Sequence, residues 1–168
     1  MNVVLVGFMA SGKTAVGRRV ARRLGYTFLD TDHLIEDEIG ITIAQLFEEQ
    51  GEAAFRRLES AVADKLCELE NHVISTGGGI LTQPGNLERL KLAGLVVFLN
   101  ADLEEIIERL QRDTRRPLVQ GGGLREKVTA LLTERLPVYQ QSDVIIDTKG
   151  KSVNKVAGDV IHSLVERF

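Results

Sequence analysis

Hydrophobic positions follow two different spacings along this chain. Short apolar runs occupy positions 3–6, 26–29, 73–75, 95–99 and 144–146. Between these runs, apolar residues recur at every third or fourth position, as in Val16, Val20 and Leu24. A short apolar run is typical of a strand buried in a parallel sheet, and the longer spacing is typical of an amphipathic helix. The alternation predicts a three-layer α/β/α fold with a five-stranded parallel sheet.

Helix limits follow from capping residues, glycines and prolines. Gly25, Gly51 and Gly94 each end a helical pattern. Pro137 is expected to break a helix that begins near residue 125. The predicted helices cover about 15–24, 32–36, 42–50, 52–69, 86–92, 102–115, 125–136 and 152–168. No internal repeat or linker interrupts this order, so all 168 residues are expected to form one domain.

Composition narrows the class of protein. The chain is 43% hydrophobic and 27% charged, as in ordinary globular proteins. The formal net charge of −3 gives no reason to expect nucleic acid or a membrane surface as a partner. No signal peptide or membrane-spanning run is apparent, and a single cysteine agrees with a reducing compartment, so we expect a cytoplasmic protein. That residue, Cys67, lies on the apolar side of a predicted helix and is expected to be buried.

The first apolar run leads directly into Gly-x-x-x-x-Gly-Lys-Thr at positions 7–14. Gly7 and Gly12 permit tight turns, so that the amides of residues 10–14 can point inward and bind anions at a helix N-terminus. Lys13 supplies a charge to the β- and γ-phosphates, and the Thr14 hydroxyl is an oxygen ligand suited to Mg²⁺. The motif predicts a P-loop that binds a nucleoside triphosphate; a glycine-rich turn without a ligand is the alternative.

Two acidic residues, Asp30 and Asp32, follow the second strand. In an extended segment their side chains would project to the same side. One carboxylate could then serve Mg²⁺ through water, while the other accepts a hydrogen bond from a substrate hydroxyl. The alternative is that Asp32 only caps the next helix. No acidic residue ends the third or fourth strand, where many P-loop enzymes hold Mg²⁺, and this favours Asp30 as the metal's carboxylate.

Three consecutive glycines, residues 77–79, follow the third strand. Glycine at such a place allows a substrate to lie directly against backbone amides. Ligands of open parallel sheets bind at the carboxyl ends of the strands. The P-loop, the two aspartates and this glycine triplet are therefore expected to border one cleft, which holds a second substrate beside the triphosphate.

Arg56 and Glu59 lie one turn apart on the predicted helix over 52–69. At about 100° per residue, Glu59 falls in the apolar sector and Arg56 at its edge, so the carboxylate needs Arg56 as a partner. A guanidinium held in this way could bind a substrate carboxylate. A purely structural ion pair is the alternative, and Arg57 is expected to point into solvent.

Further arginines flank a glycine-rich stretch: Arg109, Arg112, Arg115 and Arg116. Such a stretch is typical of a mobile lid, here about residues 111–124, that closes over polyphosphate. A solvated charged loop is the alternative. Arg135 could face the cleft or solvent. The histidines have no metal-ligand spacing and are expected at the surface: His33, His72 and His162.

Six segments in this order resemble the shikimate kinase family, whose members transfer phosphate from ATP to the 3-hydroxyl of shikimate. They lie at 7–14, 30–32, 55–59, 75–79, 116–118 and 135–139, and the resemblance covers nearly the whole chain. It implies the fold of nucleoside monophosphate kinases with strand order 2-3-1-4-5, which the hydrophobic pattern does not give. It also implies ATP and Mg²⁺ as cofactors, a monomer, and an acceptor-binding segment at about residues 32–60.

The resemblance also implies roles for single residues. Arg56 and Arg135 would hold the shikimate carboxylate, and Asp32 its hydroxyls. The candidate catalytic residues are Lys13, Asp32 and Arg116, and the candidate metal residues are Thr14 and Asp30. The candidate nucleotide-binding residues are Ala10, Ser11, Gly12, Lys13, Thr14, Ala15, Arg109, Arg116 and Lys151. The candidate acceptor-binding residues are Asp32, Arg56, Glu59, Gly77, Gly78, Gly79 and Arg135.

Two other interpretations stay open at this stage. Gluconate or a nucleoside monophosphate could be the acceptor, because Arg56 and Arg135 suit any carboxylate or phosphate. A nucleotide-dependent switch would be a different class of protein. A GTPase would carry Asn-Lys-x-Asp, and the Asn-Lys-Val-Ala at 154–157 lacks the aspartate.

Overall fold

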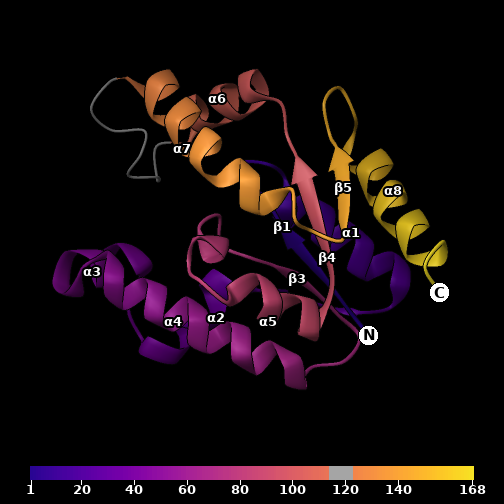
Figure 1. Cartoon of the computed structure of the whole chain (residues 1–168), viewed down its shortest axis with the longest axis horizontal. Coiled ribbons are helices and arrows are strands. Elements are labelled where there is room, and N and C mark those ends of the chain that lie inside the picture. Colours follow the sequence, from indigo (N-terminus) through magenta and orange to yellow (C-terminus); the bar gives the residue numbers. More distant parts are fainter. Residues whose placement is uncertain (114–122) are drawn as a thin grey trace.

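The computed structural model describes residues 1–113 and 123–168. Within these residues, five strands form one parallel sheet in the order β2-β3-β1-β4-β5 (Figure 1). The strands are β1 (Asn2–Val6), β2 (Thr27–Asp30), β3 (His72–Ser75), β4 (Gly94–Asn100) and β5 (Val144–Asp147). The order 2-3-1-4-5 implied by the family resemblance is thereby confirmed.

Helices cover both faces of the sheet. They are α1 (Lys13–Leu24), α2 (Thr31–Ile39), α3 (Ile43–Gln50), α4 (Glu52–Lys65), α5 (Asn86–Ala93), α6 (Leu103–Arg112), α7 (Leu124–Tyr139) and α8 (Val153–Val165), with two short 3₁₀ turns, η1 (Leu66–Glu68) and η2 (Ile80–Thr82). Side chains of β1 alternate between the faces. Val3 and Leu5 pack with apolar residues of α1 and α8, whereas Val4 and Val6 pack with those of α4 to α7. None of the described helices has the length and apolar character needed to cross a membrane.

The central strand explains why the apolar runs are continuous. All five residues of β1 are buried, since the strand is paired on both sides and covered on both faces. The carboxyl ends of β1, β2 and β3 therefore meet at one edge of the sheet, and the loops that follow them lie side by side there.

The prediction that Pro137 ends its helix was wrong. Helix α7 continues through Pro137 to Tyr139. A proline near the end of a helix removes only one hydrogen bond, which here is the bond to the carbonyl of Thr133. The buried Tyr139 keeps the last turn in place, because its ring stacks on Phe98 with a centroid distance of 4.9 Å.

The prediction that Cys67 is buried was also wrong. Its side chain is exposed. Helix α4 ends at Lys65, and the chain tightens into η1, which has about three residues per turn. The tighter turn rotates Cys67 away from the apolar stripe that the α-helical spacing predicts.

Candidate active site

The P-loop connects β1 to α1 and has a strained backbone. Gly12 adopts a left-handed conformation with φ 92°, and so does the non-glycine Ala10 with φ 60°. Left-handed conformations of non-glycine residues are uncommon and cluster at functional sites. The Lys13 ammonium donates to the carbonyls of Gly7 and Phe8, both at 2.8 Å. Because α1 begins at Lys13, its first amides face this loop and favour an anion there.

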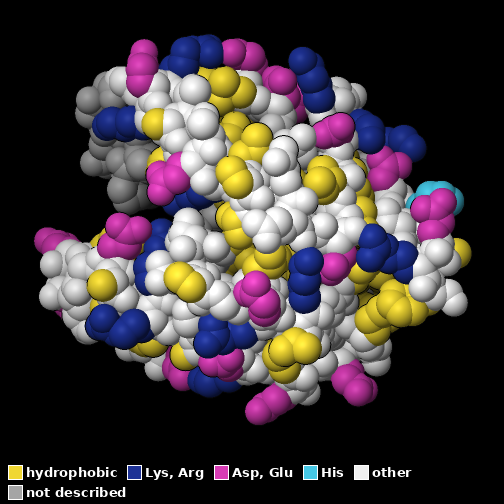
Figure 2. Space-filling view, viewed as in Figure 1, with side chains coloured by type: hydrophobic (Ala, Val, Ile, Leu, Met, Phe, Trp, Pro, Cys, Tyr) yellow, Lys and Arg dark blue, Asp and Glu magenta, His cyan; other side chains and the backbone are white. Residues whose placement is uncertain are grey.

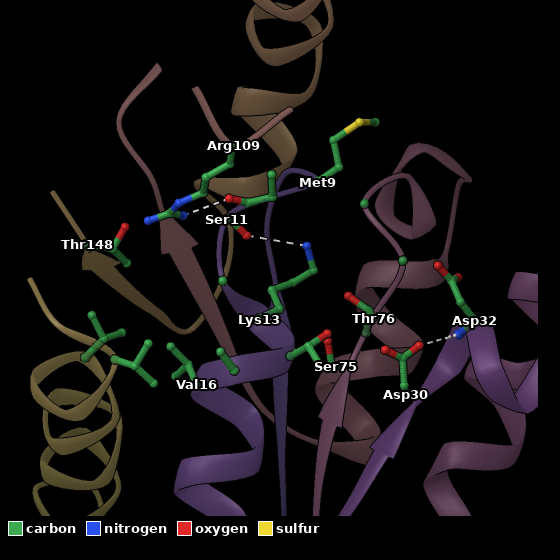
Figure 3. A pocket seen from close by; sticks show the side chains of 18 of the residues that line it. Met9, Ser11, Lys13, Val16, Asp30, Asp32, Ser75, Thr76, Arg109 and Thr148 are labelled. Atoms are coloured by element: carbon green, nitrogen blue, oxygen red, sulfur yellow. Dashed lines mark hydrogen bonds between the residues drawn. The ribbon is translucent and has the colours of Figure 1, made fainter. Parts of the chain in front are cut away.

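This loop forms one wall of an open cavity of about 490 Å³ (Figure 3). Figure 3 shows Lys13 in its middle, with Asp30 and Asp32 on one side and Arg109 and Thr148 on the other. The polar lining residues are Ser11, Lys13, Thr14, Asp30, Asp32, Ser75, Thr76, Arg109, Asp113, Thr148 and Lys151, and the lining includes Gly77 and Gly78. The predicted meeting of the P-loop, the aspartates and the glycine triplet is confirmed for Gly77 and Gly78, whereas Gly79 does not line this cavity.

The two aspartates do not lie in one extended segment, as the sequence analysis assumed. Asp30 ends β2, and Asp32 stands in the first turn of α2. Asp30 Oδ1 accepts the amides of Asp32 at 2.9 Å and His33 at 3.4 Å. The residue that caps α2 is therefore Asp30, and the alternative that Asp32 caps this helix was wrong. Because the chain turns directly from strand to helix, both carboxylates still open onto the cavity.

The glycine triplet allows charged side chains to reach the end of β3. A Cβ added to Gly77 would lie 2.7 Å from Asp32 Oδ1 and 2.9 Å from Glu59 Oε1. A Cβ added to Gly79 would lie 2.4 Å from Arg56 Nη1. Any side chain at these two positions would displace the acidic and basic groups, so glycine is required for this arrangement.

The middle glycine joins this region to the P-loop. A Cβ on Gly78 would lie 3.2 Å from the Met9 amide nitrogen and 3.6 Å from Arg135 Nη1. Arg135 is 8% exposed, and its guanidinium lies 5.6 Å from the centre of the Phe8 ring. Arg135 is therefore buried beside Gly78 and Phe8 and does not face bulk solvent, one of the two places left open for it. It does not itself line the P-loop cavity.

Arg56 and Glu59 form the predicted ion pair. Arg56 Nη1 lies 2.6 Å from Glu59 Oε2, and Glu59 is completely buried. Burial raises the pKa of Glu59 to about 7, because loss of hydration outweighs the stabilisation by Arg56. Arg56 also binds Glu52 at 2.9 Å, which holds the guanidinium from a second side.

Two buried polar atoms of this region have no hydrogen-bond partner among the described residues. They are Glu59 Oε1 and Arg135 Nη1. A buried polar atom without a partner is costly and requires an explanation, such as a ligand that supplies one. The glycine triplet, the two arginines and these atoms together favour a small acceptor that carries both an anionic group and hydroxyls.

The other end of the cavity suits a nucleobase. Arg109 Nη1 donates to the Ala10 carbonyl at 2.8 Å, which holds its guanidinium over the P-loop. Thr148 Oγ1 is buried without a partner in the described part of the chain, and Lys151 pairs with Asp159 at 3.0 Å. Thr148 is not among the residues predicted for the site. It directly follows β5, so the rule that ligands bind at the carboxyl ends of strands could have found it.

A second cavity, of about 780 Å³, lies between α4 and α7. Figure 2 shows the surface hollowed where α3 and α4 face α7. Arg56 and Arg135 line this cavity, as do Arg57, Glu52 and Glu134. Arg57 is exposed, as predicted, but it faces this hollow.

Part of the predicted site lies outside the described residues. Arg115, Arg116 and most of the predicted lid at 111–124 belong to this part, so the roles expected of them stay predictions. Arg112 is exposed and pairs with Glu108 at 2.6 Å. Within residues 1–113 and 123–168, no group of three His, Cys, Asp or Glu residues could hold a metal ion. Of the histidines, His33 and His162 are exposed and His72 is half-buried.

The fold and the site together define the class of protein. A parallel sheet of order 2-3-1-4-5, a P-loop after β1 and a polar cavity beside it are those of a P-loop kinase related to the nucleoside monophosphate kinases.

Comparisons with known proteins identify the family. The family model described as shikimate kinase matches residues 9–165. The shikimate kinase of Pelotomaculum thermopropionicum is 46% identical over 98% of this chain and 96% of its own length. That of Geobacter sulfurreducens is 46% identical over 95% of this chain and 88% of its own. The chain belongs to the shikimate kinase family, whose activity is the ATP-dependent phosphorylation of shikimate.

Solved structures agree with this assignment. The structure of "Shikimate kinase from Acinetobacter baumannii in complex with shikimate" has a TM-score of 0.93 and 39% sequence identity, covering 99% of this chain and 93% of that chain. A gluconokinase from Sinorhizobium meliloti has a TM-score of 0.60 at 17% identity, covering 98% of this chain and 91% of that chain, which shows a shared fold alone.

Proposed function

We propose that this chain transfers the γ-phosphoryl group of ATP to the 3-hydroxyl of shikimate and releases shikimate 3-phosphate and ADP. One observation carries the proposal: the glycine triplet packs against Asp32, Arg56 and Arg135. Asp32 lines the cavity of the P-loop, and the two arginines line the second cavity. An acceptor bound to these side chains would have a hydroxyl next to the terminal phosphate of a nucleotide.

The acceptor is proposed to bind with its carboxylate between Arg56 and Arg135. Two guanidinium groups recognise a planar carboxylate through parallel hydrogen bonds. Glu59 acts indirectly, because it holds Arg56 in place through their contact at 2.6 Å. Asp32 and the amides of the triplet would then bind the hydroxyls. The acceptor-binding segment is proposed to be residues 32–60, which form α2, α3 and most of α4.

The donor nucleotide is proposed to bind along the 490 Å³ cavity. Residues 10–15 would surround the β- and γ-phosphates with backbone amides, and Lys13 would stabilise the charge on the transferred group. Arg109, Thr148 and Lys151 would contact the nucleoside. Arg116 is proposed to reach the phosphates from a lid at 111–124, as the family resemblance implies.

Mg²⁺ is the proposed metal cofactor. The Thr14 hydroxyl and the Asp30 carboxylate both face the cavity, and Asp30 Oδ2 accepts no hydrogen bond from any described residue. Oxygen donors of this kind fit Mg²⁺, whose other ligands would be phosphate oxygens and water. When bound, the ion neutralises charge on the β- and γ-phosphates.

The chain's own residues supply orientation and proton transfer. Asp32 is proposed to orient or deprotonate the acceptor hydroxyl, and the two arginines fix the ring so that this hydroxyl faces the phosphate in line. The chain is proposed to act as a monomer in the cytoplasm, as the family resemblance implies.

A coupled assay for ADP release tests this function. The purified chain is mixed with ATP, MgCl₂ and shikimate, gluconate or AMP in turn. Of the three acceptors, only shikimate is expected to give ADP release. Turnover with gluconate or AMP but none with shikimate would contradict the proposal.

A further inference from the structure

The last residue of α7, Tyr139, contacts the glycine triplet. Tyr139 is 1% exposed, and its ring stacks on Phe98 at an interplanar angle of 17°. Its hydroxyl donates a hydrogen bond to the carbonyl of Gly78. Arg135 lies one helical turn earlier, so the same helix end supplies both a cleft arginine and a contact to the triplet backbone.

Three consecutive glycines need such an anchor. Glycine populates a wide range of backbone conformations, so a triplet alone does not define where its amides point. No side chain of the triplet can fix it by packing. Within the described residues, its backbone hydrogen bonds are those of Gly77 N to Thr31 Oγ1, of Ile80 N to Gly77 O, of Thr82 N and Oγ1 to Gly79 O, and the bond from Tyr139.

The bond from Tyr139 acts on one peptide plane. The Gly78–Gly79 peptide is trans, so its carbonyl and its N–H point in opposite directions. With the carbonyl held by Tyr139, the Gly79 N–H points away from α7. Gly79 also packs so closely on Arg56 that a Cβ would lie 2.4 Å from Nη1. Rotation of this peptide would therefore change the direction of the Gly79 N–H and the surface on which the Arg56 guanidinium packs.

We infer that Tyr139 is a positioning residue for the acceptor site, which acts through the Gly78 carbonyl to hold the glycine triplet against Arg56 and Arg135. The inference rests on the proposed function. Burial raises the pKa of Tyr139 to about 12, so its hydroxyl keeps the donated proton across the neutral range. The other role open to Tyr139 is that of a core residue that affects only stability.

The variant Tyr139→Phe tests the inference, because it keeps the stacked ring and removes only the hydroxyl. The other tyrosine of the chain, Tyr26, is half-buried and packs against the core on the opposite face of the sheet, and Tyr26→Phe is the control. In Tyr139→Phe, KM for shikimate should rise about tenfold, as expected for the loss of one buried hydrogen bond, while KM for ATP changes less than twofold. Tyr26→Phe should leave both values unchanged.

A second variant separates positioning from stability. Phe98→Leu removes the stacking partner and keeps the hydroxyl, so it should lower the melting temperature without the selective rise in KM for shikimate. Equal effects of Tyr139→Phe on both KM values, or a lower melting temperature with an unchanged KM for shikimate, would overturn the inference.

Amide spectra of the ¹⁵N-labelled protein give a reading that is independent of turnover. In Tyr139→Phe, the signals of Gly78 and Gly79 should shift or broaden in the free protein, while signals of the P-loop glycine Gly12 stay in place. Unchanged Gly78 and Gly79 signals would overturn the inference even if the wild type phosphorylates shikimate. If these signals shift but the wild type does not use shikimate, the proposed function fails and the anchoring by Tyr139 stands.

Discussion

The two halves of the cleft are built in different ways. The phosphate-binding part of the proposed donor half is a continuous segment, residues 7–14, whose polar groups are mostly backbone amides, with left-handed turns at Ala10 and Gly12. The acceptor half combines side chains from α2, α4 and α7 with the glycine triplet after β3, and it contains a completely buried carboxylate, Glu59. We therefore expect phosphate binding to depend on local conformation, and acceptor binding to depend on long-range packing and on buried charge.

The largest expected effect lies in the donor half. Lys13→Ala removes the side-chain charge of the P-loop and should lower kcat about a thousandfold, as expected for a group that stabilises transferring charge. Shikimate binding should change less than threefold, because the acceptor half does not contain Lys13. Steady-state kinetics and calorimetry measure the two effects. Lys155→Ala, in the exposed start of α8, is the control, and a large loss of shikimate affinity in Lys13→Ala would show that the halves are not separate.

The converse effect is expected from Arg56→Ala. This change removes a partner of the buried Glu59 and should weaken shikimate binding about a hundredfold, within the range for truncation of a buried charge pair. ADP affinity should stay within twofold. Arg57→Ala changes the exposed neighbour and should weaken shikimate binding less than threefold. Calorimetric titration with shikimate and with ADP measures both affinities. Similar losses of shikimate affinity in Arg56→Ala and Arg57→Ala would mean that the ion pair of Arg56 with Glu59 has no special role.

A smaller effect is expected from a single methyl group at the triplet. In Gly79→Ala the new Cβ would meet the Arg56 guanidinium at 2.4 Å, so the guanidinium must move. KM for shikimate should rise about tenfold, equivalent to ~1.4 kcal/mol of binding free energy. Gly158→Ala in α8 is the control, since its Cβ would lie 3.8 Å from the nearest side-chain atom. An unchanged KM for shikimate in Gly79→Ala would contradict the packing argument.

The buried carboxylate also predicts a pH dependence of stability. Burial raises the pKa of Glu59 from its ordinary value of 4.5 to about 7. Between these values the native state binds more protons than the unfolded state, so stability falls as the pH rises from 4.5 to 7 and is constant above that range. Relative to Glu59→Gln, the free energy of unfolding of the wild type should therefore decrease by about 3 kcal/mol over this range.

Urea denaturation at several pH values measures this difference. The control is Glu52→Gln, which changes the exposed partner of Arg56. The difference in the free energy of unfolding between the wild type and Glu52→Gln should stay constant over this pH range. If the wild type and Glu59→Gln have parallel stability curves, Glu59 does not titrate in this range and the electrostatic account of the acceptor half is wrong.

Features that depend on local sequence could be predicted, and features that depend on long-range packing could not. The P-loop is one local motif, and the pairing of Arg56 with Glu59 follows from helical spacing alone, so both were predicted. The place of Arg135 was left open, because it depends on how α7 packs across the sheet. The resemblance to a family supplied the strand order, which hydrophobic spacing does not contain.

The errors concern local geometry at element ends. The capping role of Asp30 depends on β2 passing into α2 without a loop, which the spacing of two acidic residues does not show. The exposure of Cys67 depends on a 3₁₀ turn, and the continuation of α7 past Pro137 depends on the contacts of Tyr139 with Phe98 and Gly78. In each case tertiary contacts or a change of helical pitch overrode the periodic pattern.

A crystal structure of the complex with shikimate and ADP tests the central claim most directly. We predict that the shikimate carboxylate contacts Arg56 and Arg135, and that the ring lies against Asp32 and Gly78 with its 3-hydroxyl facing the ADP β-phosphate. Shikimate bound only in the outer cavity beside Arg57 and Glu134, out of reach of Asp32, would contradict this account.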